Sequence, residues 1–461
     1  MTEVIVFNNL TKKEEPLSGH KTNLLNIYTC GPTVYDHSHI GHARASITWD
    51  FIVRFLRYIG FNISWTRNIT DIDDKIINKA NELKSHPDKI ARIFTHSYHE
   101  DMNALNVAWP DFEPKATQYL HEMIDFIKTL IEMGSAYQIE NDVYFSIETF
   151  KNYGRLKGQN IKELEKGFGR IEPNPKKKNP LDFALWKGIK NKEEYGFESI
   201  WGKGRPGWHL ECSVMNHEIY NTNLDIHCGG DDLIFPHHEN EIAQSETHSN
   251  KQFAKYWLHN GMVLVNGKKM SKSEGNYVTI KDILKDFSGN ALRLFILNTH
   301  YRMPINFTEE AINAAQNGIN RIQESLSDFK NDKESFSEIN EFKNEFIEGM
   351  SNDFNSPIAL SVLFKLTEHI NKETSPKEKT NLQKTLLILS KTLGFCWERK
   401  PESNSKANTI LNTIINELLL WRTECKLNKD FNSSDRIRNI LTKSSIEIKD
   451  LPDNKSKWQI K

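Results

Sequence analysis

The sequence predicts an α/β protein built on a Rossmann-like, doubly wound parallel sheet with an inserted domain, followed by an α-helical bundle and a small C-terminal module. Two βαβ units, near residues 26–65 and 224–258, predict the sheet. After residue 316, long Glu/Lys/Asn-rich stretches carry apolar residues at helical spacing and predict the bundle. A chain of 461 residues is expected to divide into several domains.

The first βαβ unit opens with an apolar strand at 26–30, which leads through a turn-rich loop into a helix that begins near Gly41. Apolar residues at helical spacing continue to Gly60, where a helix C-terminus is expected. Residues 61–65 then alternate as a strand. The crossover makes parallel pairing of the two strands the economical arrangement.

The second unit repeats this order. An apolar strand at 224–228 is followed by Gly229-Gly230, a helix from about 235 to 244 and an apolar strand at 256–258. Two such halves are typical of a nucleotide-binding doubly wound sheet.

The remaining segments predict the domain organisation. We expect a first domain at 1–316, with an insertion at about 111–205 and a connector at about 251–316. A helical bundle is expected at 317–401, and a polar stretch separates it from a module at 402–461.

The composition fits a soluble globular protein of the cytoplasm. Apolar residues make up 38% of the chain and charged residues 26%, no run is long enough to cross a bilayer, and the N-terminus lacks the pattern of a signal peptide. Five scattered cysteines indicate a reducing compartment in which thiols are available to bind metal. With a net charge of -1, any contact with nucleic acid must use local patches.

A short histidine motif, His39-Ile40-Gly41-His42, lies where the first strand passes into its helix. A helix N-terminus offers free N–H groups and partial positive charge, so this turn is a natural seat for phosphate. His39 and His42 are placed at that end, and Gly41 allows close approach of a nucleotide. The alternative is that so short a string arises by chance.

A lysine motif, Lys269-Met270-Ser271-Lys272-Ser273, follows a strand that ends in the hairpin turn Asn266-Gly267. Lys269 and Lys272 are positioned to neutralise charge that develops on a transferred phosphate. A solvated lysine loop is the competing interpretation. Together the two motifs indicate an enzyme that splits ATP between its α and β phosphates.

Four further side chains form a candidate metal set. His237 and Glu241 are four residues apart on the expected helix and therefore share one face. Cys30 ends the first parallel strand, and Cys212 offers a second thiol. Cys, Cys, His and Glu suit zinc, although the spacing matches no compact zinc motif and single cysteines are often core residues.

The two ATP motifs resemble those of class I aminoacyl-tRNA synthetases, and segments 30–36, 205–213 and 235–241 are similar to the cysteinyl-tRNA synthetase family in particular. This resemblance extends from the first strand to the last residues. It implies activation of L-cysteine by Mg²⁺-ATP to cysteinyl-adenylate, then transfer to the 3′ end of tRNA(Cys) with release of AMP and pyrophosphate. It also implies catalytic roles for His39, His42, Lys269 and Lys272, ATP contacts from Gly41, Ser271 and Ser273, and a monomer.

The resemblance assigns one zinc to Cys30, Cys212, His237 and Glu241, with the thiolate of substrate cysteine joining the coordination. It leaves as non-ligands His238, Cys228, Cys396 and Cys425. Cys228 stands where the family usually has glycine. Because zinc binds a thiolate far better than a hydroxyl, the resemblance also implies that no editing domain is needed.

The same resemblance places Thr70 and Trp208 in the cysteine pocket and Asp232 on the nucleotide. For Trp208, plain core packing is the alternative. In the C-terminal module, Phe431 is expected to stack on an anticodon base, and Asp435 and Asp450 to accept from base amino groups. The family often has tryptophan at 431 and arginine at 426, and solvated surface positions remain open for both aspartates.

Two other functions compete with this prediction. One is a ligase of the same family that joins cysteine to a sugar amine; the residues after 401 argue against it, because such enzymes lack the anticodon module. The other is a non-catalytic tRNA-binding paralogue, against which the intact motifs and ligands argue.

Overall fold

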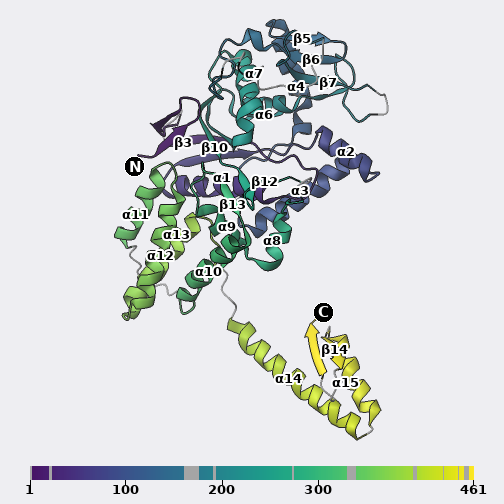
Figure 1. Cartoon of the computed structure of the whole chain (residues 1–461), viewed down its shortest axis with the longest axis vertical. Coiled ribbons are helices and arrows are strands. Elements are labelled where there is room, and N and C mark those ends of the chain that lie inside the picture. Colours follow the sequence, from purple (N-terminus) through teal and green to yellow (C-terminus); the bar gives the residue numbers. More distant parts are fainter. Residues whose placement is uncertain are drawn as a thin grey trace. The chain divides into compact units, whose positions relative to one another are not determined.

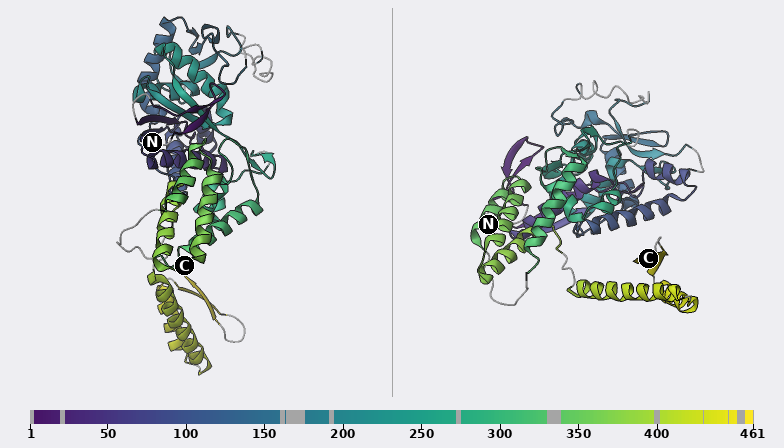
Figure 2. Two further views of the ribbon diagram at one scale, coloured as in Figure 1. Left: turned by 90° about the vertical axis from the view of Figure 1, so that its left-hand side faces the viewer. Right: turned by 60° about the horizontal axis from the view of Figure 1, so that its bottom comes forward.

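The computed structural model describes residues 3–19, 23–159, 163, 176–190, 194–271, 275–329, 339–397, 402–428, 430–444, 446–450 and 456–460. The chain folds as two compact units, Met1–Cys396 and Trp397–Lys461 (Figures 1 and 2).

A four-stranded sheet with the order β10-β9-β3-β4, in which every neighbouring pair is parallel, forms the centre of the first unit. Its strands are β3 (Leu24–Thr29), β4 (Asn62–Arg67), β9 (Leu224–Gly230) and β10 (Ala254–Asn260). The chain leaves β3 toward one edge and β9 toward the other, so the β3–β9 junction is a topological switch point with a crevice at its carboxyl ends. Both predicted βαβ units and the doubly wound fold class are confirmed.

Helices cover both faces of this sheet. On one face lies α1 (Ile40–Tyr58), whose buried residues recur along its length; it ends as predicted, with Gly60 at φ +103°. On the other face, α6 (Trp208–Tyr220) and α7 (Glu239–Ser249) enclose a cluster of buried side chains with the sheet. That cluster contains Tyr28, Cys212, Met215, Ile242 and Trp257.

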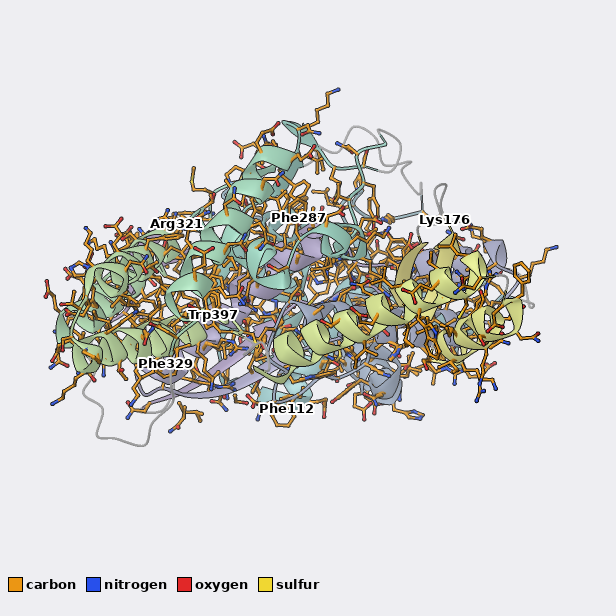
Figure 3. The ribbon with its side chains drawn as sticks, turned by 90° about the horizontal axis from the view of Figure 1, so that it is seen from below. Phe112, Lys176, Phe287, Arg321, Phe329 and Trp397 are labelled. Carbon is orange, nitrogen blue, oxygen red and sulfur yellow. The ribbon has the colours of Figure 1, made fainter. Side chains whose placement is uncertain are left out.

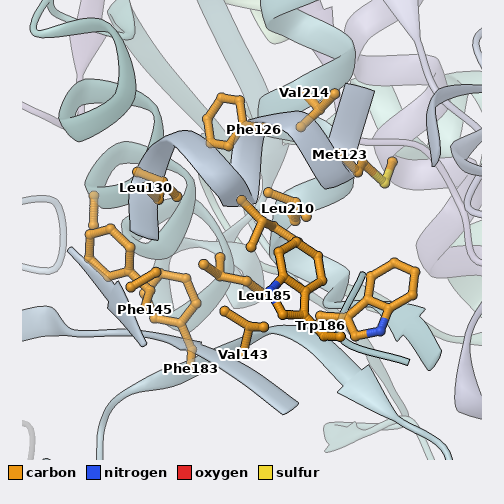
Figure 4. Close-up of a cluster of buried hydrophobic side chains, with 14 of the residues drawn as sticks. Met123, Phe126, Leu130, Val143, Phe145, Phe183, Leu185, Trp186, Leu210 and Val214 are labelled. Carbon is orange, nitrogen blue, oxygen red and sulfur yellow. The ribbon is translucent and has the colours of Figure 1, made fainter. Parts of the chain in front are cut away.

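The insertion forms its own antiparallel sheet with the order β5-β6-β7-β8. Its elements are α4 (Leu120–Glu132), β5 (Ala136–Ile139), β6 (Asp142–Phe145), β7 (Phe183–Gly188) and β8 (Gly204–Pro206), with 3₁₀ turns at Ala116–Tyr119 and Ile147–Thr149. Figure 4 shows Met123, Phe126 and Leu130 of α4 among apolar side chains of β6 and β7. This core orients α6, because Leu210 and Val214 belong to it too.

At its start the insertion is tied to the edge of the central sheet. Phe112 bridges to Thr66 and Lys115 to Ile69, both in parallel register. Phe112 itself is half exposed at the molecular surface (Figure 3).

The connector carries a small sheet with the order β12-β11-β13. Its elements are β11 (Val263–Val265), β12 (Lys268–Lys269), α8 (Ile280–Asp286), α9 (Gly289–Leu297) and β13 (Ile305–Phe307). Asn266 at φ +50° and Gly267 at φ +76° form the predicted hairpin turn, which needs left-handed backbone at both central residues.

The other elements of the first unit flank these. They are β1 (Ile5–Asn8), β2 (Lys13–Pro16), α2 (Asp74–Glu82), α3 (Pro87–Ala104), α10 (Glu309–Ser325), α11 (Asn340–Ser351), α12 (Ser356–Lys372) and α13 (Pro376–Thr392). The helices α10 to α13 pack on one another as the predicted bundle (Figure 1).

The second unit consists of α14 (Glu402–Leu427), α15 (Phe431–Lys443), β14 (Ile446–Asp450) and β15 (Ser456–Ile460). A small apolar core of Ile415, Leu419, Ile437, Leu441 and Ile446 joins them. Among the described residues of both units, no helix is both long enough and apolar enough to cross a membrane.

Asp101, buried on α3, makes stability depend on pH. One of its carboxylate oxygens has no hydrogen-bond partner among the described residues, and burial raises its pKa to about 6, with Lys281 opposing. The folded chain therefore holds this proton more tightly than the unfolded chain. Its stabilising contribution is complete below about pH 4 and is lost as the pH rises through about 6.

Asp101→Asn is expected to raise the free energy of unfolding by about 2–3 kcal/mol at pH 8 and to have little effect near pH 4. Denaturant unfolding at the two pH values measures this difference. Asp125→Asn, at an exposed aspartate of α4, is the control. An equal change at both pH values for Asp101→Asn would contradict the prediction.

Candidate active site

The four predicted metal ligands meet at the switch point of the central sheet. Cys30 directly follows β3, Cys212 lies in α6, His237 lies in the turn Ile234–His238 just before α7, and Glu241 lies in the first turn of α7. Cys30 Sγ lies 3.8 Å from Cys212 Sγ and 3.6 Å from His237 Nε2. Glu241 Oε1 lies 3.7 Å from Cys30 Sγ and 2.9 Å from His237 Nε2. Two thiols, an imidazole and a carboxylate thus converge on one point, all four ligand atoms within 4.8 Å of one another.

A kinked turn at Ile234–His238 delivers His237, and the first turn of α7 delivers Glu241. Phe235 has extended backbone angles there, and α7 begins directly afterwards at Glu239. The sequence predicted one helix from about 235 to 244; the interruption at Phe235 is the correction. His237 and Glu241 still share a face, because the backbone is helical from residue 236 onward.

The charges of the four groups compensate one another. Burial raises the pKa of the Cys30 thiol well above its usual value, whereas the hydrogen bond from Cys30 lowers that of Cys212 to about 6. Burial disfavours a charged His237, but the Glu241 carboxylate outweighs it and raises the pKa to about 10. Burial also opposes ionisation of Glu241, yet the neighbouring histidines lower its pKa to about 2.

Two further histidines reach the same point and form a second possible metal set with Cys30 and Glu241. His227 Nε2 lies 3.5 Å from Cys30 Sγ and 3.3 Å from Glu241 Oε2. His238 Nε2 lies 3.3 Å from Cys30 Sγ. The hydrogen bonds behind His238 distinguish the two sets.

A chain of hydrogen bonds fixes which nitrogen of His238 carries the proton. Asn9 Nδ2 can only donate, so His259 Nδ1 accepts its bond of 2.8 Å. Burial lowers the pKa of His259 to about 3 and that of His238 well below normal, so both rings are neutral. His259 Nε2–H then donates to His238 Nδ1 at 2.8 Å, which leaves the His238 Nε2–H directed at Cys30. The His238 Nε2 atom that faces Cys30 therefore carries a proton and has no lone pair to offer a metal, which favours the set with Cys212 and His237 as the candidate ligands.

On the opposite side, His209 and Trp208 support His237. His209 Nδ1 lies 2.9 Å from His237 Nδ1, and the His209 carbonyl accepts from Gln244 Nε2. The Trp208 ring stacks on His237 with a centroid separation of 4.4 Å. Since Trp208 remains 38% exposed, it is not a plain core residue: one face covers a ligand and part of the ring is open to solvent.

Thr70 is buried, and its hydroxyl donates to Glu211 Oε2 at 3.0 Å. Burial raises the pKa of Glu211 well above normal. Asn68, two residues earlier, accepts from the Gly31 N–H and lies 3.9 Å from the Cys212 thiol. Asn68 Nδ2 also donates to the Thr70 hydroxyl at 3.4 Å, so these side chains form one hydrogen-bonded group beside Cys212.

The histidine motif closes the N-terminus of α1. His39 Nδ1 accepts from the Gly41 N–H at 3.0 Å, and His42 Nδ1 accepts from the His39 N–H at 3.2 Å. The two rings stack with centroids 3.8 Å apart, and burial, followed by the charge of His39, lowers the pKa of His42 well below normal. A Cβ on Gly41 would lie 2.8 Å from His39 Nδ1, so only glycine admits this arrangement.

The segment after the lysine motif pairs directly with the histidine motif. The Ile40 N–H donates to the Val278 carbonyl, and the Ile280 N–H donates to the Ser38 carbonyl. Met270 reaches to 4.0 Å from the Cβ position of Gly41. The structure thus brings together two motifs that lie more than two hundred residues apart in the sequence.

Within the lysine motif, Lys269 is exposed at the end of β12. Asn276 clamps the base of this loop: its Oδ1 accepts from the Ser271 N–H, and its Nδ2 donates to the Lys269 carbonyl. Lys272 and Ser273 lie outside the described residues.

Asp232 is exposed in the 3₁₀ turn Asp231–Leu233, directly after β9. It therefore lies at the carboxyl edge of the sheet, where a nucleotide is expected.

The predicted anticodon residues belong to the second unit. Phe431 is 62% exposed at the first position of α15, and Asp435 is exposed one turn later. Asp450 ends β14, and its side chain lies outside the described residues.

Several site residues were missed by sequence reasoning: Asn9, His209, Glu211, His227, His259 and Asn276. Histidines that interrupt the apolar strands Leu224–Gly230 and Ala254–Asn260 were a usable signal, since a buried imidazole needs a partner. Asn9 carried no such signal, because only the fold places it beside β10, where its N–H donates to the Trp257 carbonyl.

Comparison with known proteins agrees with this geometry. The family model of the class I (C) tRNA synthetase catalytic domain matches residues 16–317, and that of the DALR domain matches residues 345–397. A cysteine–tRNA ligase from Thermodesulfovibrio yellowstonii is 43% identical over 486 residues, covering 99% of this chain and 99% of the relative. One from Haemophilus influenzae is 43% identical over 459 residues, covering 98% and 99%. The chain belongs to the cysteine–tRNA ligase family. The expected family and enzyme class, a class I aminoacyl-tRNA synthetase, are confirmed.

Solved structures support the fold. A methionyl-tRNA synthetase of Mycobacterium tuberculosis in complex with methionyl-adenylate aligns with a TM-score of 0.58 at 15% identity, covering 80% of this chain and 89% of that one. A putative arginyl-tRNA synthetase of Campylobacter jejuni aligns with a TM-score of 0.53 at 13% identity, covering 83% and 95%.

Asn9→Asp is expected to reverse the hydrogen-bond chain, because a carboxylate accepts where the amide donates. His259 and His238 would both change tautomer, and the His238 Nε2–H would no longer face Cys30. By analogy with outer-shell partners of metal ligands, zinc affinity should fall roughly 10- to 100-fold. Competition with a chromogenic chelator measures it.

Asn313→Asp, on the exposed side of α10, is the control. Unchanged zinc affinity in Asn9→Asp would mean that the polarity of the chain does not matter to the ligands.

Proposed function

We propose that this chain activates L-cysteine with ATP to cysteinyl-adenylate, releasing pyrophosphate, and then transfers the cysteinyl group to the 3′ end of tRNA(Cys), releasing AMP. The observation that supports this proposal is that the Cys/His/Glu cluster and the histidine motif lie at the same edge of the central sheet. Cys30 of the thiol-rich cluster directly follows β3, and the stacked pair His39 and His42 lies at the start of α1, the helix that follows β3. The group that would select a thiol and the group that would hold phosphates therefore both follow the carboxyl end of β3.

Zinc fits the cluster by its donor chemistry. Two thiols, one imidazole and one carboxylate form the soft and borderline donor set that zinc takes in proteins. Glu241 is fully buried, and its two carboxylate oxygens lie 2.9 Å from His237 Nε2 and 3.3 Å from His227 Nε2, so the carboxylate points into the cluster. When bound, zinc would supply a Lewis-acid position that takes a thiolate and lowers the thiol pKa.

Selection of cysteine over serine follows from that position. A pocket that selects its substrate by side-chain size gains only about 1–3 kcal/mol of binding preference for a difference of one methylene. A thiol ionises far more readily than a hydroxyl, so a thiolate-binding site rejects serine strongly. Trp208, stacked over His237 and partly open, would cover the substrate side chain, and Thr70 would form the floor of the pocket.

The chain needs no nucleophile of its own for adenylate formation. The carboxylate of cysteine attacks the α phosphorus of Mg²⁺-ATP, and positioning together with charge stabilisation is sufficient. His39 and His42, at the N-terminus of α1, would donate to the phosphates; Lys269 and Lys272 would neutralise the charge that develops on them. Gly41 leaves room for the nucleotide, Ser271 and Ser273 would donate to phosphate oxygens, and Asp232 would contact the nucleotide.

The partition of the chain is part of this proposal. Residues 1–316, which include the insertion at 111–205 and the connector at 251–316, would perform catalysis. Residues 317–401 would contact tRNA. Residues 402–461 would read the anticodon. Phe431 is suited to stack on a base because most of its ring is exposed. Asp435 and Asp450 would accept from base amino groups. We propose a cytoplasmic monomer.

Cysteine-dependent ATP–pyrophosphate exchange tests the first step. Exchange is expected with cysteine and at least 100-fold weaker with serine, since the thiolate site is the source of selectivity. Cys212→Ala should abolish exchange and zinc binding together; Cys396→Ala, at an exposed cysteine outside the cluster, is the control. No exchange with cysteine, or equal exchange with serine, would overturn the proposal.

Charging of tRNA(Cys) separates this function from its competitors. Exchange without tRNA charging, but with transfer to an amino sugar, would identify the sugar amine ligase. Binding of tRNA without exchange would identify the non-catalytic paralogue.

Zinc binding to the metal-free protein should displace two protons near neutral pH. Cys212 and Glu241, with pKa values of about 6 and about 2, are already ionised at pH 7. His237, at about 10, and Cys30, whose pKa is raised by burial, are both still protonated. The apparent zinc dissociation constant should therefore fall about 100-fold per pH unit from pH 7 to 9.

Chelator competition across this range measures the slope, and calorimetry in buffers of different ionisation enthalpy counts the protons. A slope of zero would show that the four groups are not the ligands.

A further inference from the structure

Arg44, two residues after the histidine motif, is a fully buried cation held by carbonyl groups. Its Nη1 donates to the carbonyl of Ile296 at 2.6 Å, and its Nη2 donates to those of His300 and Tyr301 at 2.9 and 3.0 Å. Thr299 and Met303 accept longer bonds of 3.5 and 3.2 Å. Within the part of the chain that the structure describes, no carboxylate forms an ion pair with Arg44.

Burying a guanidinium without a carboxylate partner costs several kcal/mol, so packing alone does not account for an arginine here. The five carbonyls belong to the C-terminal end of α9 and the turn that follows it, residues 296–303. The last carbonyls of a helix lack partners within the helix and carry partial negative charge. A planar, forked donor satisfies several of them at once, which a lysine ammonium does not. Burial lowers the pKa of Arg44 to about 10, with Asp231 opposing, so the group stays charged at neutral pH.

The 296–303 turn and the strand after it are hydrogen-bonded to the hairpin that carries the lysine motif. The Gly261 N–H donates to the Tyr301 carbonyl at 2.8 Å, and β13 pairs in parallel with β11. At the hairpin turn, the Asn266 N–H donates to the Phe307 carbonyl, and the Gly267 N–H to Asn306 Oδ1 at 2.7 Å. Arg44 therefore connects α1 to the hairpin that ends at Lys269.

We propose that Arg44 is a positioning residue that holds the hairpin bearing Lys269 in register with the His39–His42 end of α1. This inference rests on the proposed adenylation function. Arg44 does not touch substrate; it fixes the distance between the two groups that would hold the phosphates. A displacement of about 1 Å at such a site costs on the order of 100-fold in rate.

The test compares Arg44→Lys with Arg293→Lys. Arg293, on α9, is also fully buried and bonded to carbonyls, those of Leu105 and Leu393 among them, but it pairs with Asp50, and its guanidinium donates no hydrogen bond to the 296–303 turn among the described residues. Both variants are expected to lower Tm. Arg44→Lys alone should reduce kcat of cysteine-dependent ATP–pyrophosphate exchange roughly 10- to 100-fold, with the KM for cysteine changed less than about 2-fold.

A second readout does not depend on catalysis. The amides of Ile40 and Ile280, which bond across the two motifs, should lose hydrogen-exchange protection in Arg44→Lys and keep it in Arg293→Lys. If Arg44→Lys does not fold, Asn306→Ala breaks the same connection at an exposed position and should lower kcat several-fold.

Wild-type kcat and wild-type protection of both amides in a folded Arg44→Lys would overturn the proposal and leave Arg44 with a packing role. If the unmodified chain shows no exchange with cysteine, the proposed function fails, and the amide readout still tests Arg44.

Discussion

β3 pairs with β9 in parallel register, and the rest of the site depends on this contact. The pairing continues one residue beyond the strand, where the Cys30 N–H donates to the Cys228 carbonyl. It joins the two βαβ units, and because the chain leaves the two strands in opposite directions, it opens a crevice at their carboxyl ends. Cys30 stands at this crevice. A slip of one residue in register would turn Cys30 and His227 to the wrong face of the sheet.

The candidate metal cluster is organised by the hydrogen bonds around it as well as by its four candidate ligands. Asn9, from the segment after β1, sets the tautomer of His259, and His259 sets that of His238. The Nε2–H of His238 at the end of this chain faces Cys30 Sγ, so the amide of Asn9 determines the polarity of a hydrogen bond at a buried sulfur. On the other side of the cluster, His209 Nδ1 lies 2.9 Å from His237 Nδ1. Burial keeps His238 and His259 uncharged. An uncharged imidazole has one donor and one acceptor nitrogen, so each hydrogen bond of these two rings runs in one direction only.

Local patterns in the sequence were sufficient for the βαβ units, the hairpin at Asn266-Gly267 and the positions of both ATP motifs, since each depends on periodicity or on turn chemistry within a few residues. The family resemblance, and not spacing, brought Cys30 and Cys212 into one site, because 182 residues separate them. His227 and His259 escaped prediction for a related reason. Each is a single polar residue in an apolar strand, and its role is set by partners from other elements. The break at Phe235 is likewise invisible to a helical pattern, which continues through it.

Arg293 and Arg44 are both fully buried, but their charges are compensated in different ways. Arg293 joins α9 to Asp50 of α1 and to the end of α13, with a carboxylate that compensates its charge. Arg44 has no such compensation from a described side chain, and its electrostatic cost is recovered only if the carbonyls of the 296–303 turn stay aligned around it. An apolar residue would pack there without demanding that alignment. The charge thus penalises every displacement of the turn, and with it every displacement of the hairpin relative to α1. The proposed function requires this restraint, because the groups that would hold the phosphates lie on separate segments.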